Sequence, residues 1–177
     1  MNEINALFAG FGGQGIQFMS KILAYAGLYA DRQVSWMPSY GPEMRGGTCN
    51  CGVCISDEAI CSPLVTTPNV FVAMNKPSFE KFIDTVEEGG VVIIDSTLID
   101  NKVERTDVET YYVPATALAD ENGMKGLANM IIMGKMMAVT GCFTLEDMER
   151  TFAKIIPAKK AHLIEKNMQA VKLGASL

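Results

Sequence analysis

Short runs of β-branched and other apolar residues alternate along this chain with longer stretches in which apolar residues recur at helical spacing. This alternation is typical of βαβ units built around a mostly parallel sheet. The short runs predict strands over 5–9, 33–37, 49–56, 69–74, 91–95 and 108–113. The longer patterns predict helices over 15–30, 77–87, 116–121, 125–140, 145–154 and 158–172. We therefore expect an α/β fold with a mostly parallel, doubly wound, Rossmann-like sheet and helices on both faces.

Two helix starts carry capping signals. Ser78 stands where it could cap the helix predicted over 77–87, and Thr144 followed three residues later by Asp147 is a variant of the capping box. No repeat or linker rich in Pro, Gly and Ser divides the sequence. Residues 1–177 are therefore expected to form one domain.

Composition narrows the class of protein. Apolar residues make up 49% of the chain, and 15 basic against 20 acidic residues give a net charge of −5, which argues against a non-specific nucleic-acid binder. No basic signal-peptide segment opens the sequence, and the most apolar later stretch, 127–141, is too short to cross a bilayer. Five cysteines, an odd number, favour reduced thiols and hence the cytoplasm.

The first candidate site is a glycine-rich loop between the first predicted strand and helix. Gly10, Gly12 and Gly15 have the G-x-G-x-x-G spacing, and Gly13 and Gln14 complete the loop. Such a loop lets the backbone approach a phosphate, which the free N–H groups of the following helix then bind. Alternatively, the glycines only allow a helix and a strand to pack closely.

A dinucleotide site would also need an acidic residue at the end of the second strand to bind the ribose hydroxyls. The second predicted strand instead runs into 36–40, which has no acid; Asp31 precedes the strand and Glu43 lies several residues beyond it. This absence argues against an NAD-dependent dehydrogenase. A stand-alone NAD-type oxidoreductase that uses the glycine loop remains the alternative function.

The second candidate site is the segment 39–48, which reads SYGPEMRGGT. Arg45 beside Gly46 and Gly47 could present a guanidinium group to a carboxylate or phosphate. Tyr40 and Glu43 belong to the same segment. The alternative is a surface pair between Glu43 and Arg45, which would contribute little.

Three cysteines in six residues, Cys49, Cys51 and Cys54, followed by Cys61, raise the possibility of a metal site or of a cluster-binding electron carrier. Within a strand, however, Cys49 and Cys51 point to one face and Cys54 to the other, so the three thiols cannot converge on one ion. We therefore expect no metal, and we expect Cys142 to be a small buried residue.

Two single titratable residues lie outside these motifs. Asp95 ends a predicted central strand, where α/β sites gather, and is either a secondary site candidate or a cap for the loop through Ser96 and Thr97. His162, the single histidine, lies among lysines and is expected to be solvated; no nucleophile motif accompanies it.

The helix predicted over 125–140 is apolar on nearly all sides. Four methionines occur in it at helical spacings: Met130, Met133, Met136 and Met137. A helix of this kind must be buried on every side, either within the fold or against a partner chain. We favour burial within the fold.

Several of these segments together resemble a known family. The glycine loop at 10–16, the segment 39–48 with the strand that follows it, the stretch 129–134 and the final helix after 157–160 are similar to the gamma subunit of 2-oxoacid:ferredoxin oxidoreductases. The resemblance covers nearly the whole chain.

This resemblance implies a subunit of an enzyme that converts a 2-oxoacid and coenzyme A to acyl-CoA, CO2 and reduced ferredoxin. It implies that coenzyme A meets the loops 10–15 and 39–47 at a subunit interface, and that this chain holds no catalytic residue. Thiamine diphosphate and the iron–sulfur clusters would lie on partner subunits of alpha, beta and delta type. The identity of the 2-oxoacid stays open, with a slight preference for 2-oxoglutarate or a branched-chain acid.

Overall fold

The computed structural model describes residues 3–39 and 48–177. Its strands are β1 (Glu3–Phe11), β2 (Gln33–Ser39), β3 (Thr48–Ser56), β4 (Val70–Ala73), β5 (Val91–Asp95) and β6 (Glu109–Val113). Its α-helices are α1 (Ile16–Tyr29), α2 (Lys76–Phe82), α3 (Ala115–Glu121), α4 (Ala128–Thr140), α5 (Leu145–Ile155) and α6 (His162–Ala175). Short 3-10 turns follow α2 (Ile83–Thr85) and precede α6 (Ala158–Lys160). In these parts of the chain, no helix is long and apolar enough to cross a membrane.

The strands form one sheet in the order β2-β3-β1-β4-β5-β6. The pairs β1–β4, β4–β5 and β5–β6 are parallel, whereas β3 runs antiparallel to both of its neighbours, β1 and β2. Only residues 40–47 separate β2 from β3, which is too few for the crossover that a parallel neighbour requires. The prediction of a mostly parallel sheet is confirmed, with β3 as the exception.

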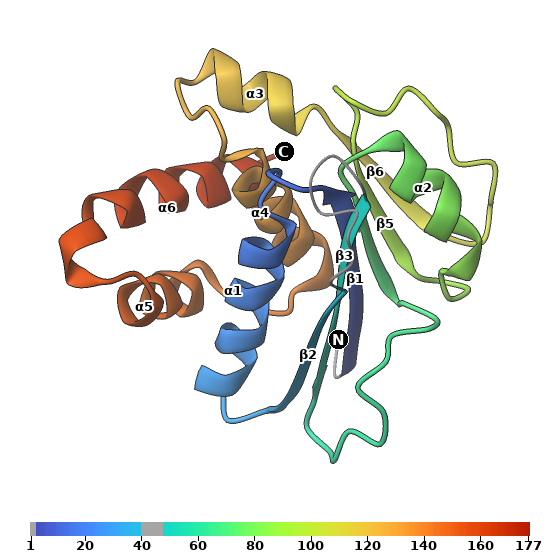
Figure 1. The fold of residues 1–177 in the computed structure, drawn as a ribbon, viewed down its shortest axis with the longest axis horizontal. Helices are drawn as coiled ribbons and strands as arrows, with labels where there is room; N and C mark the ends of the chain where they lie inside the picture. The colour runs from blue at the N-terminus through green and yellow to red at the C-terminus, as the bar shows by residue number, and fades with distance from the viewer. Residues whose placement is uncertain (1–2, 40–47) are drawn as a thin grey trace.

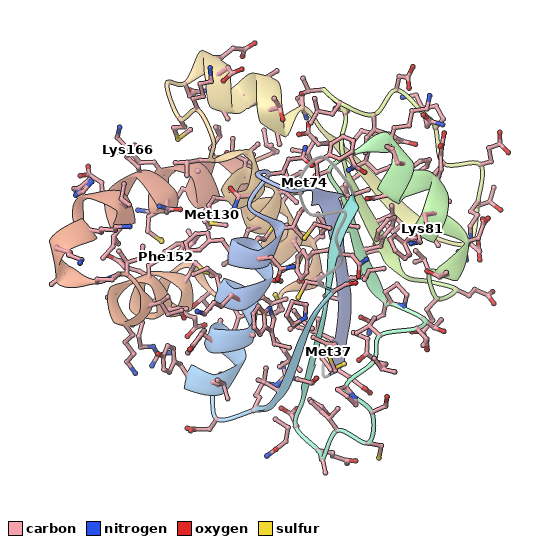
Figure 2. All side chains as sticks on the ribbon, in the orientation of Figure 1. Met37, Met74, Lys81, Met130, Phe152 and Lys166 are labelled. Carbon is pink, nitrogen blue, oxygen red and sulfur yellow. The ribbon has the colours of Figure 1, made fainter. Side chains whose placement is uncertain are left out.

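Helices cover both faces of the sheet, as predicted (Figure 1). On one face, α1 and α4 pack against the strands, and α5 and α6 form a further layer outside them (Figure 1). Phe8, Met130 and Phe152 belong to the large apolar cluster on this side. On the other face, a smaller cluster around Phe71 and Phe79 lies under α2. Charged side chains such as those of Lys81 and Lys166 lie on the outside (Figure 2).

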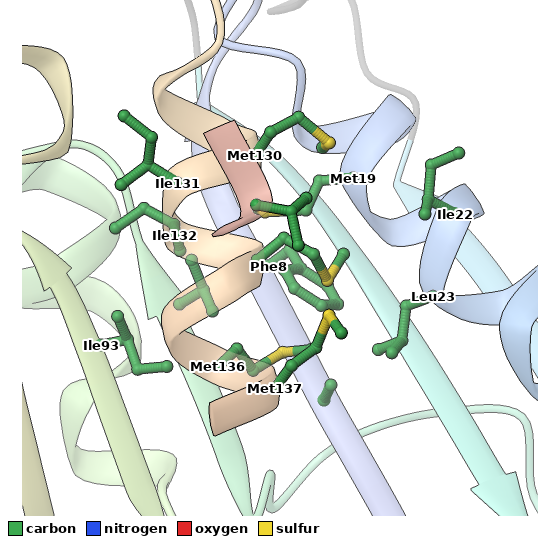
Figure 3. Packing of buried hydrophobic residues seen from close by; sticks show 14 of the residues in the cluster. Phe8, Met19, Ile22, Leu23, Ile93, Met130, Ile131, Ile132, Met136 and Met137 are labelled. Carbon is green, nitrogen blue, oxygen red and sulfur yellow. The ribbon is translucent and has the colours of Figure 1, made fainter. Parts of the chain in front are cut away.

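Helix α4 lies at the centre of the larger cluster, between the sheet and α6 (Figure 3). Its four methionines are all buried, with at most 3% of each residue exposed. Because the sheet covers one side and α6 the other, this apolar helix needs no partner chain to bury it. The core interpretation of the methionines is confirmed.

The predicted helix ends were correct in part. The capping box of Thr144 and Asp147 is present at the start of α5. The prediction that α2 starts at Pro77 with Ser78 as its cap was wrong. The N-cap is Asn75, whose side chain accepts a hydrogen bond of 2.8 Å from the backbone N–H of Ser78. Pro77 then lies in the first helical turn, where its missing N–H costs nothing, so the helix begins before the predicted cap.

Candidate ligand-binding site at the carboxyl edge of the sheet

The site begins with the topology around β1 and β4. After β1 the chain crosses through α1 to β2 on one side of the sheet, and after β4 it crosses through α2 to β5 on the other side. Because the two crossovers lie on opposite faces, a topological switch point lies between the carboxyl ends of these strands (Figure 1). Ligands of open α/β sheets bind at such points.

The glycine loop lies at this switch point. Gly13 and Gly15 have positive φ angles of 98° and 77°, which glycine adopts without strain. Gly15 is the N-cap of α1, and no side chain caps this helix end or places an acid in its first turn. The first N–H groups of a helix carry partial positive charge and lack intrahelical partners, so this end of α1 can receive an anion.

Two of the predicted glycines serve packing. A Cβ on Gly10 would lie 2.7 Å from Oε1 of Gln14, and a Cβ on Gly15 would lie 2.3 Å from Nδ2 of Asn129. That Asn129 amide donates a hydrogen bond of 3.2 Å to the Gly15 carbonyl and so ties the loop to α4. By contrast, Gly13 is exposed and a Cβ there would contact nothing within 4 Å. Gly12 is exposed beside it.

Gln14 holds the two strand ends together. Its Oε1 accepts a hydrogen bond of 2.6 Å from the backbone N–H of Phe11, and its Nε2 donates one of 2.7 Å to the carbonyl of Met74. Phe11 ends β1 and Met74 directly follows β4. Both ends of the amide are therefore engaged within the protein, and this predicted cofactor-binding residue is placed to fix the loop.

A pocket of about 300 Å³ opens beside the loop. It is lined by Gly13, Gln14, Met74, Leu98, Thr116, Ala119, Asp120, Lys125, Gly126 and Ala128. Its walls come from the ends of β1 and β4, the turn after β5, helix α3 and the start of α4. Sequence analysis missed Asp120 and Lys125. The signal that could have indicated these two residues is the pair Gly123 and Gly126, which mark a tight turn before α4 and both have positive φ angles.

Asp95 supports this pocket from below the surface. Its carboxylate is fully buried and accepts hydrogen bonds from the Thr116 hydroxyl (2.5 Å) and from the Thr97 backbone N–H (3.1 Å). Of the two roles considered for Asp95, the loop cap through Thr97 is therefore observed. Because Thr116 lies in the first turn of α3 and lines the pocket, Asp95 also fixes the position of that wall.

The second predicted motif lies largely outside the described residues. Tyr40, Glu43, Arg45, Gly46 and Gly47 all fall within 40–47. The strands on either side are described, and Thr48, where β3 begins, pairs with Phe11, where β1 ends. The start of β3 thus lies beside the glycine loop.

The cysteines alternate as predicted. Cys49 and Cys51 belong to the cluster beneath α1, whereas the Cys54 thiol points to the other face and contacts the Ser62 carbonyl. Burial raises the pKa of Cys51 to about 11 and also raises the pKa of Cys54 and of Cys142. All five cysteines are free thiols. Within the part of the chain that the structure describes, no three His, Cys, Asp or Glu side chains could hold a metal ion, and His162 is exposed.

Comparison with known proteins agrees with this architecture. The family model described as pyruvate ferredoxin/flavodoxin oxidoreductase matches residues 5–177. Subunit VorA of a ketoisovalerate oxidoreductase from Methanothermobacter thermautotrophicus is 40% identical over 173 residues, which are 98% of this chain. Subunit KorC of a 2-oxoglutarate synthase from Methanocaldococcus jannaschii is 36% identical over 169 residues, covering 94% of this chain and 89% of KorC.

A solved structure has the same fold. The gamma subunit of a keto/oxoacid ferredoxin oxidoreductase from Geobacter sulfurreducens superposes with a TM-score of 0.82 at 28% identity, covering 98% of this chain and 96% of that subunit. The chain spans only 36% of the length of the VorA relative, so VorA contains a further large segment. The family match over nearly the whole sequence confirms the resemblance: the chain belongs to the pyruvate ferredoxin/flavodoxin oxidoreductase family.

Proposed function

We propose that this chain acts as a gamma-type subunit of a 2-oxoacid:ferredoxin oxidoreductase, which converts a 2-oxoacid and coenzyme A to acyl-CoA, CO2 and reduced ferredoxin. The observation that carries the proposal is the family match over residues 5–177, supported by a KorC relative of nearly the same length. VorA contains an equivalent segment within a much longer chain. The proposal therefore applies equally to a separate subunit and to a segment of a larger one.

The role proposed within the enzyme is to bind coenzyme A at the subunit interface. A chain with a net charge of −5 repels a polyanion at long range, so binding must depend on local donors. The uncapped N-terminus of α1 behind the glycine loop supplies such donors. We assign Arg45 as the charged contact to a phosphate, with Tyr40, Glu43, Gly46 and Gly47 in the same segment.

The second proposed role is assembly of the catalytic subunits. Trp36 of the edge strand β2 and Leu28 of helix α1 are 36% and 50% exposed, and both line one surface hollow on the α1 side of the sheet. Large apolar side chains that gather on one region of a surface are typical of protein interfaces. We therefore expect partner subunits to cover this region.

The remaining chemistry is assigned to partners. Thiamine diphosphate and the iron–sulfur clusters would be held by subunits of alpha, beta and delta type, and ferredoxin would meet the assembled complex. The isolated chain would then be inactive and would carry no redox group. The five free thiols favour a reducing compartment, and we place the complex in the cytoplasm.

Capture of the native protein through an affinity tag on this chain tests the subunit assignment. We expect larger subunits to co-purify, and we expect the chain purified alone to be colourless and to bind no NAD(P)H. A lone chain or simple homo-oligomer in the native cell would contradict the proposal. NAD(P)H binding by the isolated chain would favour the alternative, a stand-alone nucleotide-binding oxidoreductase that uses the same glycine loop.

A further inference from the structure

Positive charge is concentrated in the C-terminal part of this acidic chain. Residues 150–177 contain six Lys or Arg residues but only one acidic residue, Glu165, so this segment carries a net charge of +5. The remaining nine basic and nineteen acidic residues give residues 1–149 a net charge of −10. The two parts of the chain therefore present electrostatic fields of opposite sign.

The fold separates these charges in space. The basic segment forms the second half of α5, the turn before α6 and α6 itself, in the outer layer beyond α1 and α4 (Figure 1). Helix α2 lies on the opposite side of the sheet, and it is followed by the exposed acids Asp84, Glu87 and Glu88 (Figure 1). The molecule thus has a basic side and an acidic side, so a charged partner would approach it in a preferred orientation.

Four exposed lysines lie around the connection between α5 and α6, and we call them the basic cluster: Lys154, Lys159, Lys160 and Lys166. Lys166 lies on the outside of the molecule (Figure 2). Among the residues that the structure describes, none of the four lysines makes an ion pair with a carboxylate. By contrast, Arg150 in the same segment already pairs with Asp147. An acidic surface that covered the basic cluster would provide the missing opposite charges.

Exposed apolar residues lie among these lysines. Leu163, near the start of α6, is 36% exposed. Pro157, Ala158 and Ala161, in the connection before it, are also exposed. Apolar contacts surrounded by a charged rim are typical of interfaces between proteins. The surface therefore offers a protein partner both kinds of contact.

The basic cluster adjoins the apolar surface proposed for assembly. The Nζ atom of Lys154 lies 4.2 Å from the centroid of the Tyr29 ring, at the C-terminal end of α1. Leu28, the preceding residue, lines a surface hollow together with Trp36. The two surfaces meet at the end of α1, so one partner could cover both.

The charge distribution selects the class of partner. Nucleic acid and anionic membranes are negative over a long distance, so they would also meet the −10 of residues 1–149. An acidic patch on a folded protein is local and avoids this repulsion. We infer that the basic cluster docks against an acidic surface of a protein partner that lies outside residues 1–177. The inference rests on the proposed function in one respect, because it requires that this chain works within an assembly.

Carbodiimide cross-linking of the captured native assembly tests this contact. The reagent joins a lysine amine to a carboxylate as an amide, takes up the water that is lost, and leaves no spacer between the two groups. Only residues in contact are therefore linked. Mass spectrometry should find Lys166 linked to Asp or Glu residues outside 1–177, and the yield should fall as added salt screens the charges.

Charge-reversal variants show whether the basic cluster causes the docking. Lys159→Glu/Lys160→Glu should lower the yield of the Lys166 cross-link at least about fivefold, because like charges then face each other across the interface. Lys159→Arg/Lys160→Arg keeps both charges and should retain the yield. Lys81→Glu/Lys102→Glu is the matched control, since it changes the net charge equally at two exposed lysines outside the basic cluster. It should match the wild type, and thermal unfolding checks that each variant is folded.

The outcomes separate this inference from the proposed function. The docking surface would be overturned by the absence of such a cross-link, by cross-links only to another copy of this chain, or by an equal loss in both charge-reversal variants. It would also be overturned if the wild type retained nucleic acid or lipid that Lys159→Glu/Lys160→Glu released, with no protein cross-link. These results would count even in an assembly that oxidises 2-oxoacids. A selective loss in Lys159→Glu/Lys160→Glu supports the docking surface, even in an assembly without that activity; in that case the proposed function fails and the docking surface stands.

Discussion

Individual residues in the glycine loop have different tasks, although a sequence motif treats them alike. Gly10 and Gly15 make room for Gln14 and Asn129, whereas Gly13 is open to solvent. Gln14 uses both ends of its amide to join β1 to β4. The loop therefore combines both of the roles considered from the sequence: close packing on the inner side, and an exposed backbone on the outer side that a ligand can approach.

This division predicts different costs for two glycine substitutions. Gly15→Ala places a Cβ 2.3 Å from the Asn129 amide at a φ of 77°, so it adds displacement of Asn129 to backbone strain. We expect a loss of about 2–3 kcal/mol in the free energy of unfolding. Gly13→Ala is the control, because it has the strain without the contact and should cost only about 1–2 kcal/mol. Denaturant unfolding compares the two; equal losses would contradict the packing role of Gly15.

The proposed role of Arg45 predicts a change in the Michaelis constant for coenzyme A. A charge-assisted contact to phosphate contributes roughly 1.5–3 kcal/mol, so Arg45→Ala should weaken coenzyme A binding by about ten- to a hundredfold. The Michaelis constants of the assembled enzyme for coenzyme A and for the 2-oxoacid check this, with Arg150→Ala on the surface of α5 as the control. A selective rise for coenzyme A supports the assignment. Equal rises for both substrates, or loss of assembly, would instead make Arg45 a structural residue.

At the scale of the elements, helices α4 and α6 pack with their backbones in contact. A Cβ on Gly134 would lie 2.0 Å from the Val171 carbonyl oxygen, and a Cβ on Gly174 would lie 1.8 Å from that of Ile131. The two helix backbones therefore touch at these glycines. This contact fixes α6 as the cover over the methionines of α4.

Adding a methyl group at this contact should push the helices apart. Because the obstructing atoms belong to backbone, which cannot rotate away, Gly134→Ala and Gly174→Ala should each cost roughly 3 kcal/mol or more. Gln169→Ala, on the exposed side of α6, should change stability by less than about 0.5 kcal/mol. Thermal unfolding of the three variants provides the measurement, and glycine variants as stable as the control would disprove the close contact.

The start of α5 predicts a dependence on pH. Hydrogen bonds from the backbone and hydroxyl of Thr144, assisted by Arg150, lower the pKa of Asp147 below its ordinary value of 3.8. A carboxyl whose pKa is lower in the folded state stabilises the fold above its unfolded pKa, and this contribution is lost as the pH falls through the folded pKa. Asp147→Asn should therefore be less stable than the wild type by about 1 kcal/mol at pH 7. The difference should shrink at acid pH, below about 4; a difference that stays constant with pH would exclude the ionised carboxylate as its cause.

For the whole molecule, local patterns predicted the elements better than the site. Strand β5 was predicted with its observed bounds because it is an unbroken apolar run in the middle of the sheet. The start of α4 was predicted three residues early, since Gly126 has a φ of 85° and interrupts the apolar pattern. The glycine loop could be found because all of its residues are adjacent in sequence.

Lys125 and Asp120 could not be found in that way. They reach the glycine loop only because α3 and α4 both begin at the edge of the sheet where β1 and β4 end. Similarly, the partner of Gln14 is the carbonyl of Met74, a backbone atom that carries no residue-specific signal. Contacts that depend on the path of the whole chain leave no local pattern to detect.

The most direct test of the account is the activity of the assembly captured through this chain. With a series of 2-oxoacids, including 2-oxoglutarate and branched-chain acids, the complex should reduce ferredoxin only when coenzyme A is also present, and it should release CO2 and acyl-CoA in equal amounts. An assembly that contains this chain but oxidises no 2-oxoacid, or does so equally well without coenzyme A, would contradict the account.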